Sequence, residues 1–173
     1  MATEFSREFF ADNRIVKASL RCAHKLREKD LDRIKSEIKK LYDSNVPIFA
    51  ICLGHQLMAL ANGLDTHKMK YGHRGGNHPV KDLKTGRVYI TSQNHGYVVD
   101  TDKLDPKVAV PAFVNVNDGT VEGVHYLGKN AQTVQFHPEA CAGPLDSGYL
   151  FDTFMNMMEV SMLCQRMQIS KRL

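Results

Sequence analysis

The sequence has no long apolar run and few cysteines, and both absences exclude classes of protein. No stretch approaches the ~20 apolar residues that a membrane-spanning helix needs, so we do not expect an integral membrane protein. The four cysteines stand far apart without a C-x-x-C pair, which argues against a disulfide framework and a zinc ribbon. The first residues contain Glu4, Glu8 and Asp12 and no apolar core, which fits neither a secretory signal nor an organelle transit peptide. We therefore expect a cytoplasmic protein.

The composition is that of a single globular domain. The 173 residues are 43% hydrophobic and 24% charged, with a modest net charge of +4. Basic residues gather in Lys25–Lys40, where acidic residues interleave with them, and again at Lys171 and Arg172. A solvated helix face explains the first cluster equally well, so we do not expect nucleic-acid binding.

The first half of the chain alternates helix and strand. Apolar residues at spacings of three and four among charged residues predict an amphipathic helix over about 30–43. The apolar, β-branched run at 46–51 predicts a strand covered on both faces, as in a parallel sheet. After Cys52, a helix is predicted over 57–62, with Gly63 as its C-terminal cap. Helix, buried strand, tight turn and helix together indicate an α/β fold.

The second half predicts short strands and one long helix. The strand candidates are Arg87–Ser92, Val98–Val99, Ala112–Val116, Val121–Tyr126 and Ala131–Phe136. Turns are expected at 117–119 and 128–130 because both contain glycine and asparagine. From Tyr149 to about Gln165, aromatic residues, leucine and methionines follow helical spacing, which favours packing against a core or a partner over cofactor binding.

Cys52 differs from the other cysteines in its position between a predicted strand and a predicted helix. A helix N-terminus favours a thiolate, and a sharp strand-to-helix turn resembles the nucleophile elbow of hydrolases, although the glycine spacing differs from G-x-S-x-G. Position alone leaves two interpretations open for Cys52, a nucleophile and a buried small side chain. We expect Cys22, Cys141 and Cys164 to be buried small side chains.

His137-Pro138-Glu139 follows the last strand candidate. Residues two apart in an extended segment point to the same side, so Glu139 is placed to orient the His137 ring, as the third group of a catalytic triad does. On its own this tripeptide fits a capped loop or a metal ligand equally well.

Taken together, the motifs resemble those of class I glutamine amidotransferases, which use a Cys-His-Glu triad. Segment 47–56 (PIFAICLGHQ) is similar to their nucleophile segment and segment 135–139 (QFHPE) to their His/Glu segment. Four further segments, 68–80, 92–97, 115–120 and 143–152, resemble the small subunits of carbamoyl-phosphate synthase within that family. The resemblance covers about residues 33–156.

The resemblance implies a flavodoxin-like α/β fold, a reaction and a set of residues. Cys52 would attack the side-chain amide of L-glutamine, His137 would transfer protons, Glu139 would orient it, and the Leu53 backbone N–H would be one oxyanion donor. The glutamine contacts of the family correspond to Leu53, Gln56, Asn94, Gly96 and Tyr97.

The resemblance also implies a partner and a division of the chain. Ammonia would pass to a large synthetase subunit that makes carbamoyl phosphate from bicarbonate and ATP, for pyrimidine or arginine biosynthesis. No cofactor is expected in this chain, since ATP and metal belong to the large subunit. We expect the glutaminase domain to span 30–165, after an unassigned segment 1–29 and before a basic tail 166–173.

Four histidines raise the question of a metal site: His55, His73, His78 and His95. Three of them lie in segments whose counterparts in the family need no metal, and no H-x-x-x-H spacing occurs. We therefore expect no metal in this chain.

Segment 1–29 departs from the family pattern. It shows no resemblance to the first strands of the glutaminase domain, and the S-N-G-P-G-D-P type of loop that gives the second oxyanion donor in the family is not found. The expectation is a sheet with an incomplete N-terminal edge, in a fragment, a split piece or a divergent short form.

Three functional hypotheses follow. The first is the glutaminase portion of carbamoyl-phosphate synthase, and the second is a weak or inactive remnant with a binding or regulatory role. The third, a glutaminase for another synthetase, is disfavoured by the G-G-N-H-P and Q-N-H-G segments.

Overall fold

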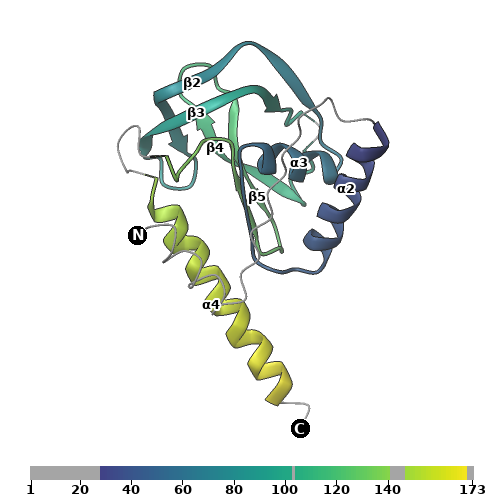
Figure 1. Ribbon diagram of the computed structural model, residues 1–173. Helices are drawn as coiled ribbons and strands as arrows, with labels where there is room; N and C mark the ends of the chain where they lie inside the picture. Colours follow the sequence, from purple (N-terminus) through teal and green to yellow (C-terminus); the bar gives the residue numbers. More distant parts are fainter. Residues whose placement is uncertain (1–27, 103, 141–146, 171–173) are drawn as a thin grey trace, which may run out of the picture. The chain divides into compact units, whose positions relative to one another are not determined.

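The computed structural model describes residues 28–102, 104–140 and 147–170 (Figure 1). The chain divides into two units, Met1–Leu31 and Asp32–Leu173, and the architecture below is that of the second. Segment 1–27, Cys22, Cys141, Gly143-Pro144, residues 171–173 of the basic tail and the side chain of Cys164 lie outside the described part, so the expectations for them stay predictions.

Three helices are described, and all three were predicted. α2 spans Glu28–Asp43, α3 spans Leu53–Ala61 and α4 spans Tyr149–Ser170. α3 begins four residues earlier than predicted, directly after Cys52. It ends at Ala61, and Gly63 follows as the predicted cap: its φ of 83° allows the Leu64 N–H to reach the Ala59 carbonyl at 3.0 Å.

The six strands form one mixed sheet. They are β1 (Ile48–Ile51), β2 (Thr66–Asp82), β3 (Val88–Val99), β4 (Ala109–Asn115), β5 (Val121–Tyr126) and β6 (Ala131–Val134), in the order β1-β6-β5-β4-β2-β3. β1 pairs with β6 in parallel, whereas the pairs β5–β6, β4–β5, β2–β4 and β2–β3 are antiparallel. The α/β class is therefore confirmed.

The sheet differs from the sequence prediction in β1, β2 and β3. Residues 66–82 were given no strand, yet they form the 17-residue β2, and the separate candidates 87–92 and 98–99 are joined in β3. β2 is rich in lysine and glycine, which have low strand propensity, but pairing with β3 supplies its hydrogen bonds and two register shifts accommodate the glycines. β1 is half-buried instead of fully covered, because it is the outermost strand of the described sheet.

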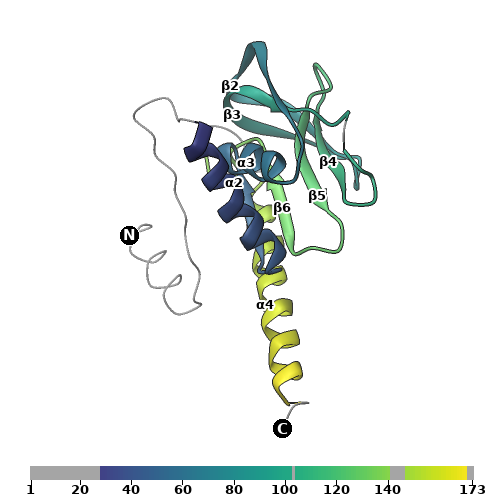
Figure 2. The ribbon, with the colours of Figure 1, turned by 90° about the vertical axis from the view of Figure 1, so that its right-hand side faces the viewer.

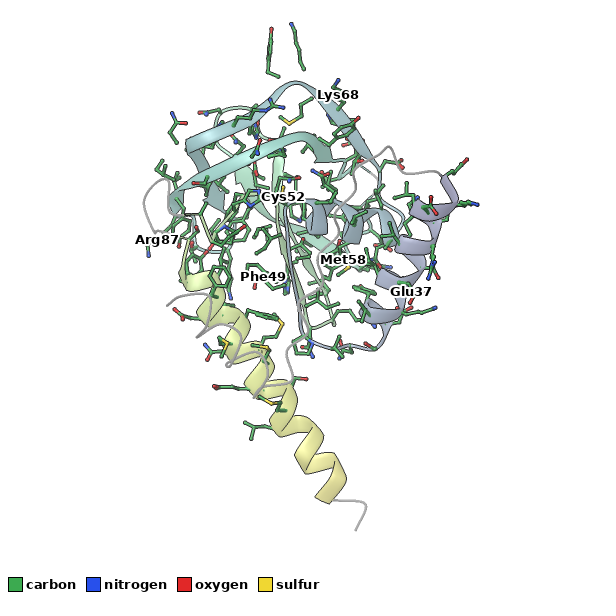
Figure 3. The ribbon with its side chains drawn as sticks, in the orientation of Figure 1. Glu37, Phe49, Cys52, Met58, Lys68 and Arg87 are labelled. Atoms are coloured by element: carbon green, nitrogen blue, oxygen red, sulfur yellow. The ribbon has the colours of Figure 1, made fainter. Side chains whose placement is uncertain are left out.

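Apolar side chains pack on both faces of the sheet. On one face, Tyr42 of α2 and Met58 of α3 pack with Val124 and Tyr126. On the other, Leu150 packs with Val134 and Phe136. The helices thus cover the sheet in layers, and Figure 3 shows Phe49 on the side of α4 and Met58 on the side of α2.

α4 makes its contacts with the sheet through its first two turns. Phe49 of β1 lies 5.6 Å from Phe151 and 5.7 Å from Phe154, ring centroid to ring centroid. Further along α4, Val160 and Leu163 are exposed. Figure 2 shows the C-terminal part of α4 extending past the sheet. None of the described helices combines the length and hydropathy that crossing a membrane requires.

Candidate active site

Cys52 occupies the turn between β1 and α3, as the sequence predicted (Figure 3). Its φ of 53° lies in the left-handed region, which is strained for a residue with a side chain. The conformation is held on both sides, because the Cys52 N–H donates to the Val134 carbonyl at 2.9 Å and the Cys52 carbonyl accepts from the Gln56 N–H at 3.2 Å. The half-buried thiol is thereby fixed at the N-terminus of α3.

His137 and Glu139 lie together beside this thiol. The His137 Nδ1–H donates to Glu139 Oε1 at 2.8 Å, and the His137 backbone N–H donates to the Ser92 carbonyl at 2.9 Å. Hydrogen bonds with Cys52 first, and with Glu139 second, raise the pKa of His137 to about 10 against the opposing effect of burial. Since Nδ1 binds the Glu139 carboxylate, Nε2 is the ring nitrogen left for the hydrogen bond with Cys52. The three residues predicted as a triad are thus adjacent.

Of the predicted glutamine contacts, Gln56 and Tyr97 meet next to the start of α3. The Gln56 Nε2 donates to the Tyr97 carbonyl at 3.0 Å, which joins α3 to the second half of β3. Asn94 and Gly96 belong to that stretch of β3, and the Tyr97 side chain is half exposed. Leu53 is the first residue of α3, so its N–H has no acceptor within the helix.

Gln135 belongs to the site, although the sequence analysis gave it no role. It is fully buried, its Nε2 lies 3.7 Å from Cys52 Sγ, and its Oε1 accepts from Gln56 Nε2 at 2.9 Å. A signal was present in the sequence, because Gln135, His137 and Glu139 alternate with a period of two and an extended segment places such residues on one side.

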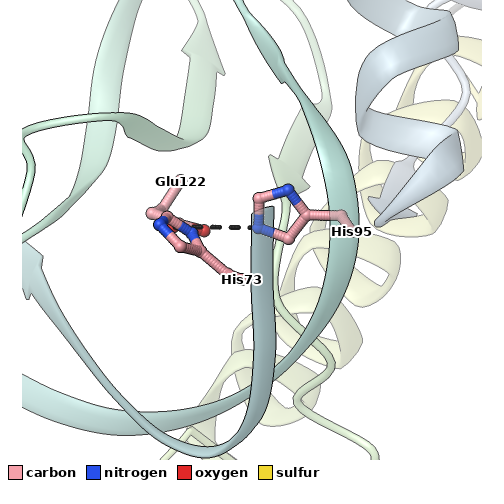
Figure 4. Close-up of side chains that lie close together, drawn as sticks. All are labelled: His73, His95 and Glu122. Carbon is pink, nitrogen blue, oxygen red and sulfur yellow. Dashed lines mark hydrogen bonds and ion pairs between the residues drawn. The ribbon is translucent and has the colours of Figure 1, made fainter. Parts of the chain in front are cut away.

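A second cluster of polar side chains lies on β2, β3 and β5. Figure 4 shows His73, His95 and Glu122, all buried, with ligand-type atoms within 4.8 Å of one another. His73 Nδ1 lies 3.0 Å from Glu122 Oε1 and its Nε2 lies 2.9 Å from Asp118 Oδ2. His95 Nε2 lies 4.0 Å from Glu122 Oε1, and its Nδ1 lies 2.8 Å from the Tyr97 carbonyl oxygen.

This cluster is a hydrogen-bonded network centred on His73, whose two ring nitrogens both face carboxylate oxygens. The hydrogen bond with Glu122 raises the pKa of His73 against the effect of burial, and Asp118 adds to the rise. These contacts favour the charged form of the His73 ring, which is the form that can donate to both Glu122 and Asp118. Imidazole and carboxylate groups are also zinc ligands, but both nitrogens of His73 already face carboxylates. The expectation that this chain holds no metal stays a prediction.

His55, another candidate metal ligand, lies in the core next to β6. It is fully buried, with Nδ1 2.8 Å from Thr133 Oγ1, and burial, with the charge of His95 as a smaller cause, lowers its pKa to about 3. The remaining histidine considered, His78, donates from Nε2 to the Arg74 carbonyl at 3.0 Å. Both side chains therefore make structural hydrogen bonds.

The chain matches known proteins over most of its length. The family model described as Glutamine amidotransferase class-I matches residues 27–157. The carbamoyl phosphate synthase small chain of Symbiobacterium thermophilum is 53% identical over 126 residues, covering 73% of this chain and 34% of the relative. The pyrimidine-specific small chain of Lactiplantibacillus plantarum is 49% identical over 130 residues, covering 75% and 36%. The chain thus spans about a third of the length of these relatives.

A solved structure supports the fold. A glutamine amidotransferase of Thermotoga maritima superposes with a TM-score of 0.58 at 16% sequence identity, covering 96% of this chain and 83% of the other. At that identity the similarity concerns the fold alone.

Proposed function

The chain belongs to the class-I glutamine amidotransferase family, and on that premise we propose that it hydrolyses L-glutamine to supply ammonia for carbamoyl phosphate synthesis. The observation that carries the proposal is the adjacency of Cys52, His137 and Glu139, with the pKa of His137 raised to about 10 by its hydrogen bonds to the other two. A nucleophile, a base and a group that orients the base are what thioester chemistry requires.

The first half-reaction forms a thioester. Cys52 Sγ attacks the amide carbon of glutamine, and the electron pair of the C=O bond moves to its oxygen, next to the Leu53 N–H. When the intermediate collapses, the C–N bond breaks and His137 gives its Nε2 proton to the departing nitrogen, which leaves as ammonia.

The second half-reaction returns the enzyme to its starting state. Neutral His137 takes a proton from water, whose oxygen attacks the thioester carbon, and the Cys52 thiolate leaves as glutamate forms. Glu139 stays ionised throughout and holds the ring through the 2.8 Å hydrogen bond to Nδ1. On this proposal Gln56, Asn94, Gly96 and Tyr97 bind the substrate, and support comes from the hydrogen bonds that join Gln56 to the Tyr97 carbonyl and to Gln135 beside Cys52.

The proposed partner is the large, ammonia-using subunit of a carbamoyl-phosphate synthase. Support comes from the relatives, which are named carbamoyl phosphate synthase small chains and are 53% and 49% identical over 126 and 130 residues. On this proposal the chain works in the cytoplasm, requires no cofactor of its own and serves pyrimidine or arginine biosynthesis.

The test is steady-state ammonia release from L-glutamine by the purified chain, alone and with a large synthetase subunit. L-Asparagine, one methylene shorter, is the control substrate and should not be hydrolysed. Glutamine-dependent release that the large subunit increases would support the proposal. A folded chain without release in either condition would support the alternative, a remnant with a binding or regulatory role.

A further inference from the structure

Gln135 directly follows β6, next to β5 and to Cys52. Its backbone N–H donates to the Glu122 carbonyl at 2.8 Å, which continues the pairing of β5 and β6 beyond the end of β6. The preceding residue, Val134, holds the Cys52 N–H through its carbonyl at 2.9 Å. The backbone of Val134 and Gln135 therefore fixes both the turn at Cys52 and the position from which the Gln135 side chain starts.

The direction of the Gln135 amide follows from its neighbours. The Tyr97 backbone carbonyl can only accept, so the end of the Gln56 side chain that faces it at 3.0 Å is the NH₂ group. That same NH₂ group lies 2.9 Å from the Gln135 side chain and needs an acceptor there, which is Oε1. The opposite end of the Gln135 amide, its NH₂ group, is therefore the one 3.7 Å from Cys52 Sγ.

We propose that Gln135 donates a hydrogen bond to the Cys52 thiolate, and that Gln56 and the Tyr97 carbonyl fix the direction of this bond. A donor on sulfur favours the ionised thiol over the neutral one. Because the Gln135 amide is neutral and does not titrate, its ability to donate does not depend on the protonation state of His137. The inference rests on the proposed function in one respect: glutamine hydrolysis is the reaction that the thiolate performs.

The test is the pH profile of Cys52 alkylation by iodoacetamide in the Gln135→Glu variant, followed by mass spectrometry of the peptide that contains Cys52. In this variant one carboxylate oxygen still accepts from Gln56, but the other replaces the NH₂ group next to the sulfur and cannot donate. We expect alkylation at neutral pH to slow about tenfold, with the midpoint of the profile moved up by about one pH unit. Gln132→Glu on β6 is the matched control and should leave the profile unchanged.

A second variant tests the direction of the bonds. In Gln56→Glu, no donor faces the Tyr97 carbonyl or Gln135 Oε1, so the Gln135 amide turns over and presents its oxygen to the sulfur. We expect the same slowing, and since Gln56 is only part-buried, this variant remains informative if Gln135→Glu does not fold.

The outcomes separate this inference from the proposed function. If the alkylation rates of Cys52 in a folded variant stay within about twofold of the parent's across the pH series, the donor role is overturned, because a lost hydrogen bond to a charged group costs more than that. A shifted profile in a chain that does not hydrolyse glutamine overturns the glutaminase and keeps the donor.

Discussion

At the scale of the residue, the site depends on one strained backbone position. Cys52 has a φ of 53°, and a left-handed residue with a side chain costs about 1–2 kcal/mol relative to a relaxed one. The hydrogen bonds to Val134 and Gln56 hold it there. Strain of this kind persists where the surrounding structure fixes it, which in this chain is the position that carries the thiol.

Replacing the proposed nucleophile tests the centre of the site. Cys52→Ser should abolish glutamine hydrolysis, because an alcohol beside His137 is a much weaker nucleophile than a thiolate. Carbamoyl phosphate synthesis from free ammonia, measured with the large subunit, should be unchanged since only the ammonia supply is lost. Glutamine turnover that survives the substitution would show that the triad is wrongly assigned.

The His/Glu pair predicts unequal losses. His137→Asn should reduce kcat by about as much as loss of Cys52, because in the proposed mechanism His137 transfers protons in both half-reactions. Glu139→Gln should be milder, and the pKa of His137, about 10 in the parent, should fall since the second-largest cause of its rise is removed. Glutamine kinetics and an NMR titration of the His137 ring measure both effects. Near-parent rates in both variants would contradict the mechanism.

At the scale of the element, the sequence predicted strands well where the residues themselves favour them. β5 matches its predicted bounds, Val121–Tyr126, because β-branched and aromatic residues lie between two glycine turns. β2 was missed because its conformation comes from pairing with β3 and β4, which local composition does not contain. The same limit applies to the site: the triad follows from its motifs, whereas the contact between Gln135 and Cys52 depends on β1 and β6 being neighbours.

Gly123 of β5 gives a test of packing within the sheet. A Cβ there would lie 2.7 Å from Phe113 Cδ2 and 2.8 Å from the Thr133 carbonyl oxygen, too close for either to remain in place. Gly123→Ala should therefore lower the free energy of unfolding by about 1–3 kcal/mol. Urea denaturation measures this, with the exposed His125→Ala on the same strand as control, expected within about 0.5 kcal/mol of the parent. Equal stability of both variants would show that β5 has room at Gly123.

At the scale of the whole molecule, the free energy of unfolding depends on pH through His73 and the carboxylates that contact it. The pKa of His73 is raised in the folded chain by Glu122, with Asp118 adding to the effect, so the folded state holds this proton more tightly than the unfolded state. The resulting stabilisation is complete below the unfolded value of 6.5 and is lost as the pH rises through the folded value. His137 acts in the same direction.

The pH dependence can be isolated by comparing two variants. In a His137→Asn background, the free energy of unfolding should fall as the pH rises above about 6.5. Adding His73→Asn should flatten this dependence, because no proton is then held between Glu122 and Asp118. Urea denaturation across the pH series measures the slopes. The same slope with and without His73 would assign the pH dependence to other groups.

The parallel pairing of β1 with β6 also sets the order in which the site is assembled. Cys52 and Gln135 are 83 residues apart, and His137 lies beyond both. A ribosome therefore exposes the thiol long before it has made the strand, the donor or the base that surround it, and pairing over such a distance is a slow step of folding. On the proposed function, the groups that activate the Cys52 thiol therefore surround it only once β6 has paired with β1. The alkylation rate of Cys52 during refolding would then report the completion of the sheet.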